Sequence, residues 1–160
     1  MEIDLHQLAQ GQTRLRFDQE APSIGLKPED VAVSGPMAID LVLDRLGDEI
    51  WIRGRLHLTS IQQCSRCLTD YPESLELDFE VFCAKVQYPN VVSSGAVEDE
   101  DGGVHFHDGR ILSIDQEIRE AVILGLPMKP LCKESCAGLC PRCGEDRNLG
   151  PCRCVATAAG

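Results

Sequence analysis

Aromatic residues are scarce in this chain, and long apolar runs are missing from it. Phe, Tyr and Trp make up 4% of the 160 residues, whereas apolar residues of all kinds make up 43%, so an aliphatic core is expected. No run of about 20 apolar residues is present, which excludes a membrane-spanning helix as the organising element. The chain does not open with a charged segment followed by an apolar one, as a secretory leader would. We therefore expect a soluble, cytoplasmic protein with one ordinary core and no membrane partner.

Positive charge is also in short supply, and it is unevenly distributed. The 15 Lys and Arg face 26 Asp and Glu, and the resulting net charge of −11 argues against a protein wrapped in nucleic acid. Residues 1–126 hold 10 Lys and Arg against 23 Asp and Glu, whereas residues 127–160 hold 5 against 3. Any binding of an anionic partner must therefore be local rather than global.

Cysteine is abundant, with nine residues in the chain. Six of them lie in the stretch LCKESCAGLCPRCGEDRNLGPCRC at 131–154, and two more form the CSRC at 64–67. Thiols spaced as CxxC, CxxxC and CxC in a reducing compartment indicate metal binding or redox chemistry rather than disulfides. Gly144, directly after CPRC, can take the positive φ that such a knuckle needs. The ninth, Cys83, falls on the apolar face of an expected strand, where it is typical of a small buried hydrophobic residue.

The other eight cysteines divide into two sets of four, as two tetrahedral zinc sites require. The last four form a compact local set, which leaves the first two of the tail to join the upstream CSRC. Interleaved groupings, such as Cys64 and Cys67 with Cys140 and Cys143, remain possible, because sequence separation is the only guide to the pairing. Iron–sulfur ligation and a dithiol enzyme are the alternatives to zinc binding. We expect two zinc ions in closed sites without a catalytic water. The expected ligands are Cys64, Cys67, Cys132 and Cys136 in one site, and Cys140, Cys143, Cys152 and Cys154 in the other.

Alternating apolar residues predict a β-rich body over residues 1–131. Period-two patterns mark strands near 2–8, 14–17, 37–43, 50–58 and 75–83, with a loop over 21–30 and a hairpin turn at Gly47-Asp48. One helix is expected near 114–126, with Ser113 as its N-cap, Gln116 as the capping-box partner, and Pro127 at its end. We thus expect an α+β fold: a mostly antiparallel sheet or partly open barrel, one main covering helix, and a C-terminal zinc-binding knuckle at 132–160 packed back on the 64–67 turn.

Two histidines form an HxH motif at His105 and His107, after an acidic loop expected over 89–103. A closed metal site needs more ligands than this motif supplies, so we interpret it as a plain edge strand. Asp108-Gly109 then predicts a hairpin turn that leads into residues 110–114.

Three motifs together resemble one protein family. They are CSRCL at 64–68, LGLPMKPLC at 124–132, and GLCPRCG at 138–144 followed by Asn148-Leu149. The chain resembles the YceD family, the large ribosomal RNA subunit accumulation proteins of bacteria and plastids. The resemblance covers most of the chain, and it implies a non-enzymatic role in ribosome biogenesis, in which the protein promotes accumulation or processing of the 23S rRNA.

Two functional hypotheses follow. In the first, the zinc tail binds 23S rRNA or its precursor, as zinc knuckles do with single strands; alternatively, the cations of the tail only offset thiolate charge. In the second, the body is an acidic adaptor that binds a basic large-subunit ribosomal protein through the strand face of Glu76, Asp78 and Glu80, with no direct RNA contact. No triad, phosphate loop or paired catalytic carboxylates can be made out, so neither an enzyme nor a small-molecule substrate is expected.

The candidate RNA-binding residues are the cations of the tail and those near it, with a strip on one strand. The strip also holds Trp51 and His57, which could stack on RNA bases. Alternatively, the strip is simply the solvent-exposed face of a strand. The candidates are Arg53, Arg55, Arg66, Lys129, Lys133, Arg142, Arg147 and Arg153.

Overall fold

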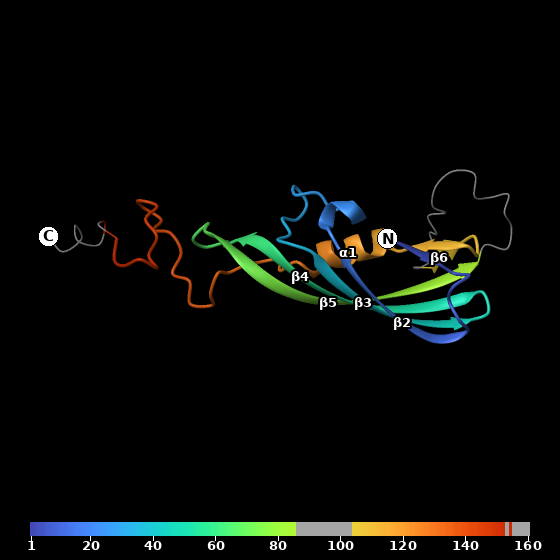
Figure 1. Cartoon of the computed structure of the whole chain (residues 1–160). Helices are drawn as coiled ribbons and strands as arrows, with labels where there is room; N and C mark the ends of the chain where they lie inside the picture. Colours follow the sequence, from blue (N-terminus) through green and yellow to red (C-terminus); the bar gives the residue numbers. More distant parts are fainter. Residues whose placement is uncertain (86–103, 153, 155–160) are drawn as a thin grey trace.

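The framework of the protein is a long, twisted five-stranded sheet in the order β2-β3-β4-β5-β6, beside a two-stranded ribbon of β1 and β7 (Figure 1). The structure is a computed structural model that describes residues 1–85, 104–152 and 154. The strands are β1 (Glu2–Asp4), β2 (Gly11–Gln19), β3 (Met37–Leu46), β4 (Glu49–Gln63), β5 (Asp70–Lys85), β6 (Val104–His107) and β7 (Ile111–Ser113). The helical elements are the 3-10 helix η1 (Ala21–Ile24) and the α-helix α1 (Asp115–Gly125).

The β4–β5 hairpin is the longest element of the sheet. Its strands have 15 and 16 residues and pair antiparallel from Glu49 opposite Ala84 to Gln63 opposite Asp70. β3 pairs with β4 only as far as His57, so the end of the hairpin extends beyond its neighbour. The turn of the hairpin, which carries the CSRC motif, thereby lies next to the C-terminal tail and away from the main core (Figure 1).

The core lies on one face of the sheet and is aliphatic, as the composition predicts. Alternate residues of β3 and β4 are almost fully buried, and α1 covers them with Ile118 and Val122, both also buried. Burying one large aliphatic side chain stabilises a fold by about 1.5–3 kcal/mol, so this face dominates the stability of the body. Cys83 is buried within it, as expected. The core positions of β3 and β4 are Met37, Ile39, Leu41, Leu43, Ile50, Ile52, Leu56 and Leu58.

The mostly antiparallel sheet with one covering helix confirms the main prediction, and the barrel alternative is wrong. Among the described strands the sheet is open, with β2 and β6 at its edges. The edge strand β6 runs parallel to β5. Asp108-Gly109 forms a turn but no hairpin, because β7 leaves the sheet and pairs with β1 instead. The loop expected over 89–103 lies outside the described residues.

Two local predictions near the N-terminus and the helix are also wrong. The strand expected over 2–8 ends at Asp4, because the carboxylate of Asp4 accepts a 2.9 Å hydrogen bond from the backbone N–H of His6 and turns the chain. Ser113 is not the N-cap of α1, since it is paired with Glu2 in the β1–β7 ribbon. Ile114 takes the cap position without a side-chain hydrogen bond.

The first turn of α1 is stabilised in another way. Its Asp115 carboxylate accepts a hydrogen bond from the amino group of Met1, which β1 brings alongside. An acid in this turn also interacts favourably with the helix dipole. Gln116 donates to Glu120 at 3.0 Å instead of to the cap. In the described part of the chain, no helix has the length and apolar character needed to span a membrane.

Gly54 allows β4 and β5 to pack around an aromatic ring, which leads to a stability prediction. Gly54 lies opposite Phe79, and a Cβ at this position would lie 2.0 Å from the nearest ring carbon. Gly54→Ala should therefore lower the free energy of unfolding by about 1–3 kcal/mol, measured by urea denaturation, because ring and strands must shift. Adding Phe79→Leu should recover part of this loss. Strictly additive effects of the two substitutions would show that the ring is not the obstacle.

Candidate metal centres

The structure gathers eight cysteines into two groups of four, and within each group all sulfur atoms lie within 4.8 Å of one another. The turn site joins the β4–β5 turn to the start of the tail, and the tail site is formed by the tail alone. This is the grouping that the spacing favours, and the interleaved alternative is not adopted. All cysteines of the chain are free thiols. The turn site consists of Cys64, Cys67, Cys132 and Cys136, and the tail site of Cys140, Cys143, Cys152 and Cys154.

The distances between sulfur atoms fit a single tetrahedral ion in each group. Cys64 and Cys136 are 3.7 Å apart at Sγ, as are Cys67 and Cys132, and one pair of the tail site is 3.4 Å apart. Four thiolates about 2.3 Å from one ion lie about 3.8 Å from each other in a tetrahedron. A cluster of several irons would hold its thiolates farther apart. Each group can therefore hold one metal ion, with all four positions filled by the protein.

Both CxxC turns share one backbone geometry. The N–H of Leu68 donates to the carbonyl of Cys64 at 2.9 Å, and the N–H of Gly144 donates to that of Cys140 at the same distance. The residue after each turn has a positive φ, 59° for Leu68 and 74° for Gly144, as expected for the glycine. A leucine in this conformation costs about 1–2 kcal/mol. The contacts of the surrounding turn must therefore impose this backbone conformation on Leu68.

Arg66 fastens the turn to the tail. Its guanidinium donates to the carbonyl of Cys136 at 2.8 Å and to that of Glu134 at 3.2 Å, while its own carbonyl accepts from the N–H of Leu139 at 3.0 Å. Arg66 is one of the predicted RNA-contact residues, and its exposed side chain makes these internal bonds in the structure. Beside it, the buried turn-site cysteines pack with Tyr71, Leu131 and Leu139 into a second, small core.

Asn148 links the two groups, and sequence reasoning missed its role. Its amide nitrogen donates to the sulfur of Cys136 at 3.4 Å and to the carboxylate of Asp146 at 2.6 Å, while its amide oxygen accepts from the N–H of Ala137 at 2.9 Å. Asn148 follows the second CxxC turn, so the loop that closes the tail site also orients a ligand of the turn site. The only signal in the sequence was its place in the Asn148-Leu149 pair.

Hydrogen bonds prepare some of the thiols for metal binding, and burial opposes ionisation of others. Backbone N–H groups, led by that of Cys132, lower the pKa of Cys64 to about 6, and those of Arg142 and Cys143 do the same for Cys140. Asn148 is the main cause of the lowered pKa of Cys136. Burial, followed by the neighbouring thiols, raises the pKa of Cys132 to about 12. Four thiols this close do not all ionise without a cation between them, which is what a bound metal supplies.

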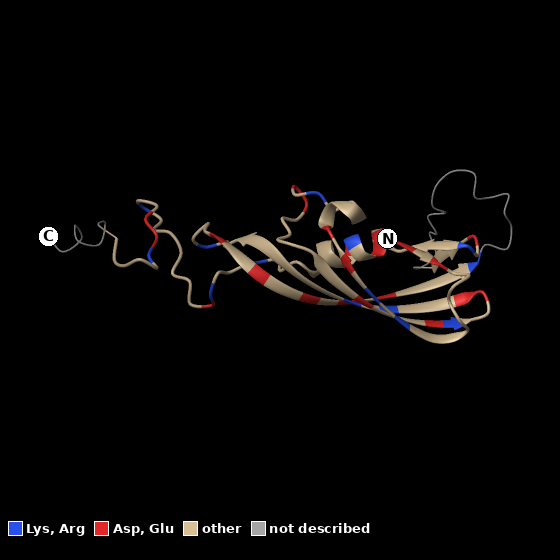
Figure 2. Ribbon diagram, viewed as in Figure 1, with Lys and Arg blue, Asp and Glu red and all other residues tan. Residues whose placement is uncertain are grey.

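The other basic candidates fall into two groups by position. On the exposed face of the sheet, Arg53 pairs with Asp44 at 2.6 Å, and Arg55 pairs with Asp78 at 2.8 Å and with Glu76 at 3.4 Å. The hydrogen bond that Arg55 donates to Asp78 raises the pKa of the Arg55 guanidinium. Figure 2 shows Lys and Arg positions along the tail in blue. The tail cations are exposed and form no ion pair among the described residues; they are Lys129, Lys133, Arg142 and Arg147. Arg153 lies outside those residues.

The histidines of β6 do not join either metal group. His105 bonds with the carboxylate of Glu117, which raises the pKa of the imidazole, and the ring of His107 lies 3.1 Å from the carbonyl of Asp48. Burial raises the pKa of Cys83 to about 12, so this thiol does not ionise near neutral pH. The edge-strand interpretation of the HxH therefore agrees with these internal contacts.

The fold and the two four-cysteine groups define a class of β-sheet protein whose cysteine-rich tail is fastened to a hairpin turn. A family model described as "Large ribosomal RNA subunit accumulation protein YceD" matches residues 52–159. The chain belongs to this family, as the three motifs predicted. The matched span starts within β4 and includes all eight cysteines of the two groups.

Two mycobacterial proteins are similar in sequence to this chain, at less than 30% identity. A protein of Mycobacterium leprae is 29% identical over 128 residues, which cover 80% of this chain, and one of Mycobacterium tuberculosis is 26% identical over 121 residues, which cover 76%. Both are named as uncharacterised proteins. The chain spans somewhat more than half the length of these relatives, 57% and 56%. No solved structure matches the chain.

The two groups should bind metal separately and in equal amount. The purified chain should contain two metal ions, and Cys67→Ser and Cys143→Ser should each leave one, because three thiolates do not complete a closed site. Cys83→Ala, which changes a buried cysteine outside both groups, should keep two. Elemental analysis per chain is the measurement. Two ions retained in either serine variant would contradict the assignment of that site.

The contact between turn and tail should depend on Gly138. Its φ is 68°, and a Cβ there would lie 2.9 Å from the carbonyl oxygen of Arg66. Gly144 has a similar φ of 74° but open space around it, so Gly144→Ala serves as the matched control. Gly138→Ala should weaken metal retention by the turn site against a competing chelator at least tenfold more than the control does. Equal losses would show that only backbone strain matters and that the close approach does not.

Proposed function

We propose that this chain is a zinc-binding factor in ribosome biogenesis that promotes the accumulation or processing of the large-subunit 23S rRNA. The observation that supports the proposal most directly is the pair of closed four-thiolate groups in a member of this family. Because no ligand position stays open for water, the groups suit a structural role, and we propose a cytoplasmic binding protein rather than an enzyme.

Zinc is the ion that we propose for both groups. Four thiolates in a tetrahedron suit zinc well, and its binding contributes on the order of 10–16 kcal/mol of apparent folding free energy in small domains. The tail buries few apolar side chains apart from its cysteines. Zinc would therefore supply most of the stability that holds the tail against the β4–β5 turn.

Contact with rRNA is proposed for the exposed cations of the tail. Lys129, Lys133, Arg142 and Arg147 are solvent-exposed and free of ion pairs among the described residues, in contrast to Arg53 and Arg55. A zinc ion with four thiolates carries a charge of about −2, so the tail cations lie beside local negative charge as well. Their exposure favours phosphate contact over simple neutralisation of the thiolates, because neutralisation would bring the side chains toward the sulfur atoms.

A second candidate function, an adaptor for a basic ribosomal protein, is supported by a different observation. Residues 1–126 hold 23 Asp and Glu against 10 Lys and Arg, and several of these acids line one groove of the body. Such a surface repels RNA and attracts basic protein segments. The two candidates use different surfaces, so one molecule could serve both.

The tail cations give the test of RNA binding. The zinc-loaded chain with Lys129, Lys133, Arg142 and Arg147 all changed to Gln should bind a 23S precursor fragment at least tenfold more weakly. The slope of log affinity against log salt should decrease by about 3, since each phosphate contact on a single strand contributes about 0.7. Fluorescence anisotropy across a salt series is the measurement.

A charge-matched variant controls this experiment. Changing Arg14, Arg16, Arg53 and Arg55 on the sheet to Gln removes the same charge and should alter affinity less than twofold. Equal metal content in both variants shows that the tail stays folded. An affinity of the parent protein that does not vary with salt, or equal losses in the two variants, would overturn the RNA proposal and leave the adaptor.

A further inference from the structure

The strand β5 has a free edge along most of its length. On one side it pairs with β4 from Asp70 to Ala84, but on the other side β6 pairs only with Phe82–Lys85. Within the described residues, no strand pairs with the part of β5 before Phe82 on that side. Unpaired backbone N–H and C=O groups of this kind are a template for another strand.

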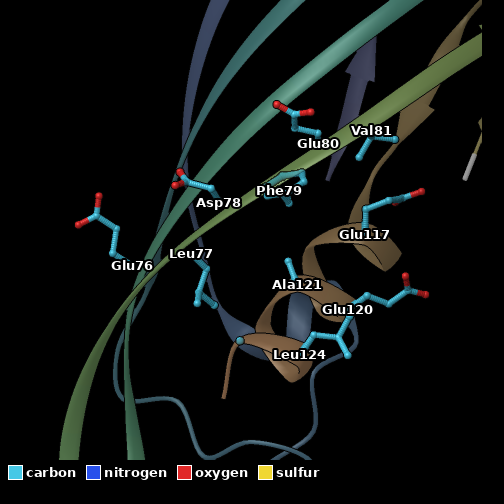
Figure 3. A pocket seen from close by; sticks show the side chains of 11 residues that line it. Glu76, Leu77, Asp78, Phe79, Glu80, Val81, Glu117, Glu120, Ala121 and Leu124 are labelled. Carbon is cyan, nitrogen blue, oxygen red and sulfur yellow. The ribbon is translucent and has the colours of Figure 1, made fainter. Parts of the chain in front are cut away.

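A groove of about 580 Å³ lies between this edge and α1 (Figure 3). Its apolar wall is formed by Leu77 and Phe79 of β5 and by Ala121 and Leu124 of α1, and Leu124 is 83% exposed. The helix packs directly against the strand at Gly125, where a Cβ would lie 2.4 Å from Leu77. The groove is thus an apolar trough beside a free strand edge, with the end of the helix against the strand.

Every charged residue that lines the groove is acidic. Arg55 pairs with two of the acids from the neighbouring strand but is 55% exposed, so solvent screens these pairs. Glu80 and Glu120 have no ion pair among the described residues. The acidic residues are Glu76, Asp78, Glu80, Glu117 and Glu120.

Glu117 adds an observation that points to a missing donor. One of its carboxylate oxygens bonds with His105, whereas the other, Oε2, is buried and has no hydrogen-bond partner in the described chain. A buried acceptor without a donor costs about 1–3 kcal/mol.

We propose that this groove binds an extended segment of a basic protein, which adds to β5 as a strand in line with β6 over residues 76–81. Side chains of an added strand alternate between faces, so its apolar residues would pack on Leu77 and Phe79 and its Lys or Arg residues would lie beside Glu76, Asp78 and Glu80. The partner segment therefore alternates basic and apolar residues. The inference rests on the proposed function only for the origin of the partner, a basic protein met during ribosome assembly.

The probe is a capped peptide of alternating Lys and Val, six residues long, titrated into the full-length zinc-loaded protein with fluorescence anisotropy as readout. A peptide of the same composition with three Lys followed by three Val keeps the charge but loses the alternation. A peptide of the alternating sequence that is N-methylated at alternate residues keeps the charge and the alternation but loses backbone N–H donors. Both controls should bind at least tenfold more weakly than the alternating peptide. Equal binding of all three would reduce the groove to a nonspecific acidic surface and overturn the proposal.

Protein variants locate the binding. Glu80→Lys with Glu120→Lys should weaken the alternating peptide at least tenfold, whereas Glu2→Lys with Glu49→Lys, which makes the same charge change elsewhere, should stay within about twofold of the parent. Leu124→Ala, at an exposed position, should weaken it several-fold without loss of stability. No effect of the groove variants would overturn the proposal.

Competing occupants are separated by two further measurements. Light scattering that shows a dimer dispersed by the peptide would place a second copy in the groove and overturn the proposal, as would displacement of the peptide by single-stranded RNA. Failure of peptide binding with intact RNA binding by the tail would reject this inference alone. Loss of RNA binding with intact peptide binding would reject the tail proposal alone.

Discussion

The arrangement of the C-terminal half depends on one constraint, which is that four sulfur atoms from two distant segments meet at one point. The turn site joins Cys64 and Cys67 to Cys132 and Cys136, and the bonds of Arg66 surround that junction. The small core beside it contains few apolar side chains, so packing alone would stabilise it little. The same constraint explains the length of the β4–β5 hairpin. The hairpin must extend beyond the main core for its turn to meet the tail.

The charges follow this division of the molecule. Arg53 and Arg55 on the outer sheet face form ion pairs with acids of neighbouring strands, as with Arg53 and Asp44 at 2.6 Å, whereas the tail cations have no ion pair among the described residues. The groove between β5 and α1 is lined on its polar side by carboxylates alone. An acidic body with exposed cations on its tail would repel polyanions from the sheet and leave those cations accessible to them. The separation of the two surfaces is consistent with the two proposed kinds of partner.

The sequence predicted the parts of the fold that depend on local pattern. Alternation between Met37 and Leu58 predicted the central hairpin and its core, and ligand spacing predicted both four-cysteine groups. Ser113 misled because its propensity to cap a helix is overridden by pairing with Glu2, a contact between residues far apart in sequence. The parallel direction of β6 and the internal role of Arg66 likewise depend on tertiary contacts. The role of Asn148 was missed because no sequence pattern shows that its amide donates to the sulfur of Cys136.

The ligand separations of the two groups also give the two sites different entropic costs of closure. The tail site draws all its ligands from residues 140–154, so it closes through a short local loop at small entropic cost. The turn site must bring Cys67 to Cys132 across 65 positions, and the β4–β5 hairpin has to form before its ligands can converge. The two groups therefore differ in what they require, since the tail site can close within its own loop, whereas the turn site depends on the folded hairpin.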